Sequence, residues 1–162
     1  MLYYYFIFIF LVTIIYLSEI AAFFWHRYGT HQEIVPHFLG VQESHHRHHT
    51  IIDDQAHGDF LYILLFLIIL AIIILYLIKQ NRISYLLGSL IYFPILLISI
   101  WNWYIHAAYH IENHWLNRYA WFQNDKRIHF QHHRDPSTNY GIATHFTDVI
   151  SDTFDYGLLK ID

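Results

Sequence analysis

Three long apolar stretches, separated by polar segments, dominate the pattern of residues along the chain. They run from about residue 2 to 25, from 60 to 78 and from 83 to 105. Each is close to the roughly 20 apolar residues that an α-helix needs to cross the hydrocarbon core of a bilayer. The stretch 60–78 lacks the polar face at helical spacing that a helix of a soluble bundle would show. The pattern therefore predicts three membrane-spanning helices.

Individual residues within and between these stretches refine the prediction. The first stretch contains one charge, Glu19, and lacks the basic start and small-residue cleavage site of a signal peptide, so we expect a span. In the third stretch, Pro94 is expected to kink the helix, which membrane helices tolerate. Only a polar turn, residues 79–82, separates the second and third stretches. These two helices should therefore be antiparallel neighbours.

The predicted fold is an all-α integral-membrane bundle of about three spans with a helical cap, and residues 1–162 are expected to form a single domain. With three spans, the polar segments 26–57 and 106–162 must face the same side of the membrane. Seven of the nine basic residues lie on that side, whereas Lys79 and Arg82 lie on the other. The positive-inside rule then predicts that segments 26–57 and 106–162 lie in the cytoplasm.

Histidine is the most unusual feature of the composition. The chain has 15 histidines, and all of them lie in the two predicted cytoplasmic segments. It has no cysteine, which excludes disulfides, thiolate-ligated zinc and thiolate-held iron–sulfur clusters. A net charge of -4 gives no basic footprint for nucleic acid. Histidine and carboxylate are therefore the strong metal ligands that remain.

Ten of the histidines fall into four spaced boxes. The boxes are HX4H (His26, His31), HX2HH (His45, His48, His49), HX3H (His106, His110) and a second HX2HH (His129, His132, His133). Positions i, i+3 and i+4 share one face of an α-helix, so the HX2HH and HX3H boxes each point their imidazoles to one side. The HX4H pair is offset on an ideal helix, which suits a helix end or two histidines that serve different metals. Because one zinc ion takes three or four ligands, ten imidazoles predict a site for two metal ions.

Other polar and aromatic residues have weaker expectations. A single histidine is usually a surface or hydrogen-bonded residue, so five are not expected to be primary ligands, although His114 and His145 are left open: His37, His46, His57, His114 and His145. The other nitrogen of a metal-bound imidazole is usually held by a carboxylate or carbonyl. Seven acids are candidates for this role, although each by itself is more readily explained as a solvated or capping residue: Glu19, Asp53, Asp54, Asp59, Glu112, Asp148 and Asp152. Interfacial anchors, or the mouth of a substrate channel, are expected from Trp25, Tyr28, Trp101, Trp103 and Tyr104.

The chemistry of the site narrows the choice of metal. Imidazole suits zinc, copper, iron and nickel. A hydrolytic zinc site often carries HExxH, and the sequences nearest to it, around Glu33 and Glu112, have the wrong order. Two metal ions beside a membrane favour another reaction, in which O2 is bound and cleaved while an apolar substrate reaches in from the lipid.

The boxes together resemble the fatty acid hydroxylase/sterol desaturase superfamily, which includes the carotenoid hydroxylases. That family opens on an acidic residue, aromatics and a tryptophan before its first histidine box, as in the segment from Glu19 to His31. Its second box matches His45, His48 and His49, and its last box precedes an N-[YF]-G, here residues 139–141. A closing W-D-x2-FGT segment is only loosely matched by residues 147–157. The chain is short for the family and has three predicted spans where four are common.

The resemblance implies a membrane enzyme with a di-iron centre, in which zinc could replace iron during purification. It implies O2-dependent hydroxylation of a lipid C–H bond, with electrons from an external donor such as a ferredoxin, or a cytochrome with its reductase. A lipid desaturase, or related C–H oxidation on the same centre, is the first alternative. A non-catalytic membrane metal-binding protein is the second. A metal transporter or a bis-histidine haem protein would need ligands inside the spans, where the sequence has no histidine.

Overall fold

The computed structural model describes residues 2–32, 41–50 and 57–157, without the side chains of residues 41–44, 50 and 57–59. These residues form helices and connecting turns, and no strand is found among them. The elements are α1 (Leu2–Phe24), a π-helix (Trp25–Thr30), α2 (Val41–Thr50), α3 (His57–Lys79), α4 (Tyr85–Tyr109), a 3-10 helix (Trp115–Arg118), α5 (Ala120–Arg134) and α6 (Phe146–Ile150). The predicted all-helical fold class is confirmed.

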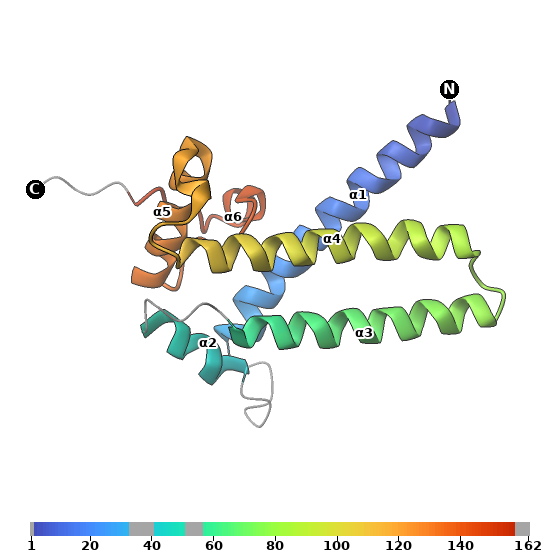
Figure 1. The fold of residues 1–162 in the computed structure, drawn as a ribbon, viewed down its shortest axis with the longest axis horizontal. Coiled ribbons are helices and arrows are strands. Elements are labelled where there is room, and N and C mark those ends of the chain that lie inside the picture. Colours follow the sequence, from blue (N-terminus) through green and yellow to red (C-terminus); the bar gives the residue numbers. More distant parts are fainter. Residues whose placement is uncertain (1, 33–40, 51–56, 158–162) are drawn as a thin grey trace, which may run out of the picture.

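Three of these helices are long and apolar enough to cross a membrane: Leu2–Thr30, Phe60–Lys79 and Tyr85–Tyr109. Helices α3 and α4 run antiparallel side by side, and α1 crosses α4 at an angle (Figure 1). In the turn after α3, Asn81 adopts a φ of 55°. This is the left-handed conformation that commonly ends a helix, and asparagine tolerates it. The Ser84 hydroxyl then caps α4 by accepting the backbone N–H of Leu87 at 3.2 Å. Helix α4 continues through Pro94.

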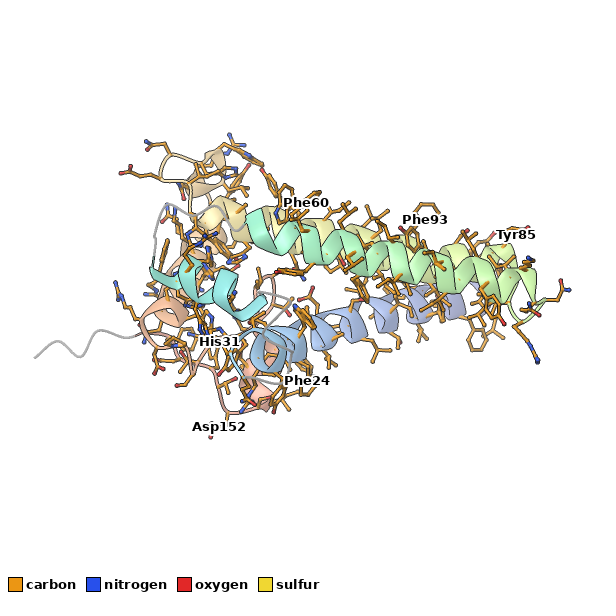
Figure 2. All side chains as sticks on the ribbon, turned by 90° about the horizontal axis from the view of Figure 1, so that it is seen from below. Phe24, His31, Phe60, Tyr85, Phe93 and Asp152 are labelled. Carbon is orange, nitrogen blue, oxygen red and sulfur yellow. The ribbon has the colours of Figure 1, made fainter. Side chains whose placement is uncertain are left out.

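The three long helices expose most of their apolar side chains. Figure 2 shows Phe60, Phe93 and Tyr85 on the outer surface of α3 and α4, and Tyr85 is 76% exposed. A continuous apolar surface of this extent is far larger than soluble monomers tolerate. Lipid is the solvent that such a surface requires, and backbone groups within it must be paired inside the helices, as they are in α-helices.

The remaining helices α2, α5 and α6 gather at one end of the spans, opposite the turn between α3 and α4 (Figure 1). A small core joins this cap to α4: Ile105, Ala108 and Tyr109 pack with Leu116 and Phe122. The Tyr109 hydroxyl also donates to the backbone carbonyl of Ile142 at 3.0 Å. These contacts fix the C-terminal end of α4 against the cap. The boxed histidines lie in the same part of the molecule.

Candidate metal centre

The ten boxed histidines come together in two groups of five. The first group contains His26, His31, His45, His49 and His132, and the second contains His48, His106, His110, His129 and His133. Within each group the candidate ligand nitrogens all lie within 4.8 Å of one another. The two regions of the sequence that hold histidine are thus brought to one place, although 106 positions separate His26 from His132.

A π-helix explains the HX4H box. Residues Trp25–Thr30 leave the end of α1 as one turn of π-helix, in which hydrogen bonds run from i to i+5. That wider turn brings positions i and i+5 onto the same side, where an α-helix would offset them. His26 and His31 accordingly belong to the same group, with ring centroids 5.1 Å apart. Of the two alternatives, the geometry therefore favours a helix end whose two histidines serve the same metal ion, and not two histidines that serve different ions.

Each HX2HH box divides its histidines between the two groups. On α2, His45 and His49 enter the first group, and His48 between them enters the second. On α5, His129 and His133 enter the second group. The i, i+4 pair is aligned along the helix, whereas the i+3 residue is rotated to one side of it. One helix can therefore supply two adjacent groups, and the stacked rings of His49 and His133, 4.3 Å apart, lie where the groups meet.

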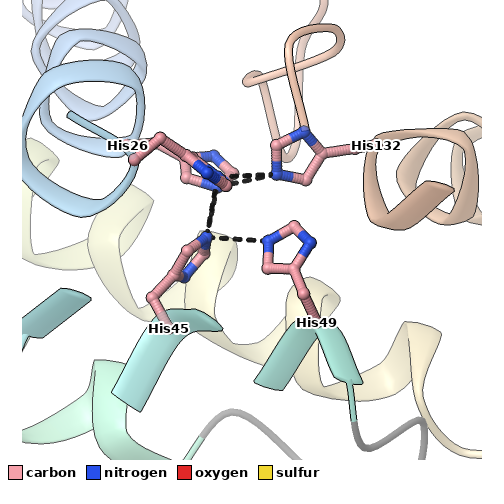
Figure 3. A group of neighbouring side chains, drawn as sticks. His26, His45, His49 and His132 are labelled. Atoms are coloured by element: carbon pink, nitrogen blue, oxygen red, sulfur yellow. Dashed lines mark hydrogen bonds between the residues drawn. The ribbon is translucent and has the colours of Figure 1, made fainter. Parts of the chain in front are cut away.

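In the first group the Nε2 atoms converge (Figure 3). His45 Nε2 lies 3.1 Å from that of His26 and 2.9 Å from that of His49. It also lies 2.9 Å from His31 Nε2. His132 Nε2 lies 3.1 Å from the same atom of both His26 and His31.

In the second group, imidazole nitrogens also lie close together, and the side chains are more deeply buried than in the first group. His48 Nε2 lies 3.0 Å from His106 Nε2, and His110 Nε2 lies 2.9 Å from His129 Nε2. Both nitrogens of His133 are buried and have no hydrogen-bond partner among the described residues. Four members of the group are at most 8% exposed: His48, His106, His110 and His129.

The contacts between His26 and His132 show that these nitrogens fit a cation better than they fit each other. His26 Nδ1 lies 2.6 Å from the carbonyl oxygen of Tyr140, and His132 Nδ1 lies 2.6 Å from that of Thr138. A carbonyl only accepts, so each Nδ1 carries the proton and each Nε2 of a neutral ring carries a lone pair. Two lone pairs then face each other at 3.1 Å. Two nitrogens bound at right angles to one ion, each about 2.1 Å from it, would be roughly 3.0 Å apart.

Burial keeps these rings neutral. It lowers the pKa of His31 to about 3 and that of His133 to about 2, with the neighbouring histidines adding to the effect. Desolvation likewise places the pKa of His45, His129 and His132 well below the usual value. Metal ions bind deprotonated imidazole, so the sites are in the form that binds a metal at neutral pH.

Where the structure describes them, the candidate acids orient the imidazoles only indirectly or not at all. The Nδ1 atoms of His26 and His132 are held by backbone carbonyls. Asp148 accepts hydrogen bonds from the backbone N–H groups of Tyr140 and Gly141, which flank the Tyr140 carbonyl. Glu19 accepts hydrogen bonds from Asn102 and Thr144.

Of the other candidate acids, Glu112 and Asp152 are exposed. Asp53 and Asp54 lie outside the described residues, as does the Asp59 side chain. The chain segment that presents the two carbonyls, residues 138–141, was not predicted to have this role. The sequence signal that could have found it is Asn139-Tyr140-Gly141, directly after the last box.

The histidines expected to be non-ligands lie outside both groups where they are described. His46 is exposed on α2. His114 caps the 3-10 helix by accepting the backbone N–H of Leu116. Because α4 ends at Tyr109, His114 does not continue the helical face that carries His106. His145 lies 3.8 Å from carboxylate oxygens of Asp125 and Asp148.

His37 falls outside the described residues, and so does the side chain of His57. The predicted interfacial aromatics lie at the cap end of the spans: Trp25 and Trp101 are exposed, and Tyr28, Trp103 and Tyr104 are half-buried. Trp103 packs on Phe60 with ring centroids 4.9 Å apart.

Comparison with known proteins agrees with the geometry. The family model described as fatty acid hydroxylase matches residues 10–153, which covers all four histidine boxes and most of the chain. No curated protein shows significant similarity to the chain. No protein of solved structure does so either. With this match and a membrane-sized helical bundle that ends in two histidine groups, the chain belongs to the fatty acid hydroxylase family.

Proposed function

We propose that this protein hydroxylates a C–H bond of a lipid with O2 at a pair of iron ions held by the ten histidines. The observation that carries the proposal is the convergence of two sets of five imidazoles, side by side, at one end of three membrane-sized helices. Membership of the fatty acid hydroxylase family supports the same reaction class.

The set of donors supports a redox-active metal. Both groups consist of imidazoles alone among the described residues. A catalytic zinc site keeps about three protein ligands and an open position, whereas each group here offers five. Imidazole suits iron as well as zinc, so zinc could occupy the groups in a purified sample. When bound, a pair of iron ions supplies the O2 activation that oxidation of an unactivated C–H bond requires.

The overall reaction fixes what else is needed. Hydroxylation converts R–H and O2 to R–OH and water, and it consumes two electrons and two protons. We propose that a separate protein, such as a ferredoxin or a cytochrome with its reductase, delivers the electrons. The histidine groups belong at the cytoplasmic face, because most basic residues accompany them and Lys79 and Arg82 lie at the other end of the spans.

The chain's own residues position the site and exclude water from it. The carbonyls of Tyr140 and Thr138 hold the protons of His26 and His132 on Nδ1, which aims Nε2 inward. His132 is fully buried, and His129 is 3% exposed. Helices α1, α3 and α4 end at the cap that carries the groups (Figure 2), so an apolar chain can approach from the bilayer.

Lipid profiling tests this proposal. Membranes of cells that express the wild-type chain should contain a lipid that has gained one oxygen atom, and growth under ¹⁸O2 should label that atom. His133→Ala should abolish the product, whereas His46→Ala, one residue from His45 but exposed and outside both groups, should retain it. Loss of two hydrogens in place of oxygen gain would show desaturation. An unchanged lipid profile with wild-type protein that contains iron would contradict the proposal.

A further inference from the structure

One peptide group connects a buried carboxylate to the first histidine group. The peptide between Tyr140 and Gly141 accepts the Nδ1–H of His26 on its carbonyl oxygen, at 2.6 Å. The N–H of the same peptide donates to Asp148 Oδ2 at 2.7 Å. The imidazole, the peptide and the carboxylate therefore form one continuous chain of hydrogen bonds.

Asp148 is built into this position. It is 0% exposed, and its Oδ1 accepts the backbone N–H of Tyr140 and the hydroxyl of Thr153, both at 2.8 Å. A buried carboxylate is costly unless it is hydrogen-bonded, and these donors supply the bonds. His145 lies beside this carboxylate, with its Nδ1 3.8 Å from Oδ2, and Asp125 lies 3.8 Å from the other nitrogen of that ring.

The neighbouring peptide offers an internal comparison. The carbonyl of Thr138 accepts the Nδ1–H of His132, and the N–H of the same peptide, on Asn139, donates to the backbone carbonyl of Thr153 at 2.8 Å. This second chain has the same form but ends on a neutral oxygen. Of the two, only the chain through His26 ends on a carboxylate.

Gly141 is needed for this arrangement because of its missing side chain. A Cβ at this position would overlap the carbonyl oxygen of Thr144 and lie 2.7 Å from Asp148 Oδ2. The close approach of carboxylate and peptide therefore depends on glycine.

We propose that Asp148 is a positioning residue for the first metal site, which acts on His26 through the Tyr140–Gly141 peptide. Carboxylate–histidine–metal triads fix the tautomer of the ring and raise the basicity of the ligand. Chains of hydrogen bonds polarise one another, so a carboxylate one peptide away has the same effect in weaker form. The proposal rests on the proposed metal binding of the two groups, and it adds a residue that touches no imidazole of either group among the described contacts.

Metal titration of the purified full-length chain tests it. Asp148→Asn keeps the shape and one acceptor oxygen but presents an NH2 group to the Gly141 N–H. With cobalt(II) as the probe, the wild type should bind two ions. The variant should bind one as before and the other up to about 10-fold more weakly, because loss of a direct outer partner costs about 10- to 100-fold and this carboxylate acts through one further peptide. Asp152→Asn, an exposed acid in the same segment, is the matched control and should leave both affinities unchanged.

The outcomes are separable. Wild-type affinity at both sites in Asp148→Asn would overturn the inference and leave the proposed function standing. Equal weakening of both sites would also overturn it, because the effect would not be specific to His26. If Asp148→Asn does not fold, Thr153→Val tests the same chain by removing one donor, and it should weaken only one site; no change would overturn the inference. A wild type that binds no cobalt, iron or zinc would overturn the inference and the proposed function together.

Discussion

Two adjacent histidines of α5 should control different metal ions. His132 belongs to the first group, where its Nε2 lies 3.1 Å from those of His26 and His31. His133 belongs to the second group, with its ring centroid 4.5 Å from that of His129. We therefore predict that His132→Ala and His133→Ala each lose one ion, and not the same one. The double variant should lose both.

The size of the effect follows from binding linkage. Losing an outer partner of a ligand weakens metal binding by about 10- to 100-fold, and we expect loss of the ligand itself to cost at least as much. At a metal concentration about 100 times the dissociation constant, one bound ion stabilises the fold by about 2.7 kcal/mol. A 100-fold weaker site retains about 0.4 kcal/mol of this, so the metal-dependent stability falls by about 2.3 kcal/mol. For a chain of this size, that corresponds to a fall in Tm of roughly 5 to 9 °C.

The assay combines metal content with thermal unfolding in detergent, each with and without added metal. Only the metal-dependent part of the Tm is compared, because truncation also removes packing and the bond from His132 to Thr138. His46→Ala, exposed on α2, is the control and should bind two ions. Two ions in either single variant, or loss of the same ion in both, would refute the division of the boxes between two groups.

Three further predictions concern acid, topology and a buried acid. Burial depresses the pKa of His31 below its unfolded value of about 6.5, so the unfolded state binds more protons and the metal-free chain should lose stability as pH falls from about 6.5 to 3; a Tm that stays constant over this range would be inconsistent. The chain has no cysteine, so Gln80→Cys and Ser137→Cys, both exposed, should react with an impermeant thiol reagent from opposite sides of the membrane; labelling from one side would disprove the topology. Glu19→Ala should leave the Asn102 amide without its acceptor and lower the free energy of unfolding by about 1–3 kcal/mol in denaturant titration, whereas a neutral result would show that water or lipid replaces the contact.

The group to which each boxed histidine belongs depends on the local backbone conformation, which the spacing of the histidines in the sequence does not determine. The HX4H box is offset on an α-helix, and a single π-turn after Phe24 brings its two histidines together. Likewise, α4 ends at Tyr109, so His114 leaves the helical face on which its spacing would place it. Such choices cost little free energy within the helix, so contacts made elsewhere in the fold decide them.

The supporting residues were harder still to predict. The Nδ1 partners of His26 and His132 are main-chain carbonyls, and every residue type carries one. Asp148 could be named as a candidate acid, but its contact with the Tyr140–Gly141 peptide arises only when the segment after α5 folds back.

The sequence by itself determined the spans and the ten boxed histidines. Long apolar runs can be stable as helices only in lipid, and helical spacing places the histidines of most boxes on a common side, so both properties are local. Only the tertiary structure decided how the ten divide into two groups of five, and which carbonyls and carboxylate stand behind them. The reason is that these contacts join separate elements of the chain, up to 106 positions apart for His26 and His132, and their geometry is set by the packing of α1, α2, α4 and α5 around one point.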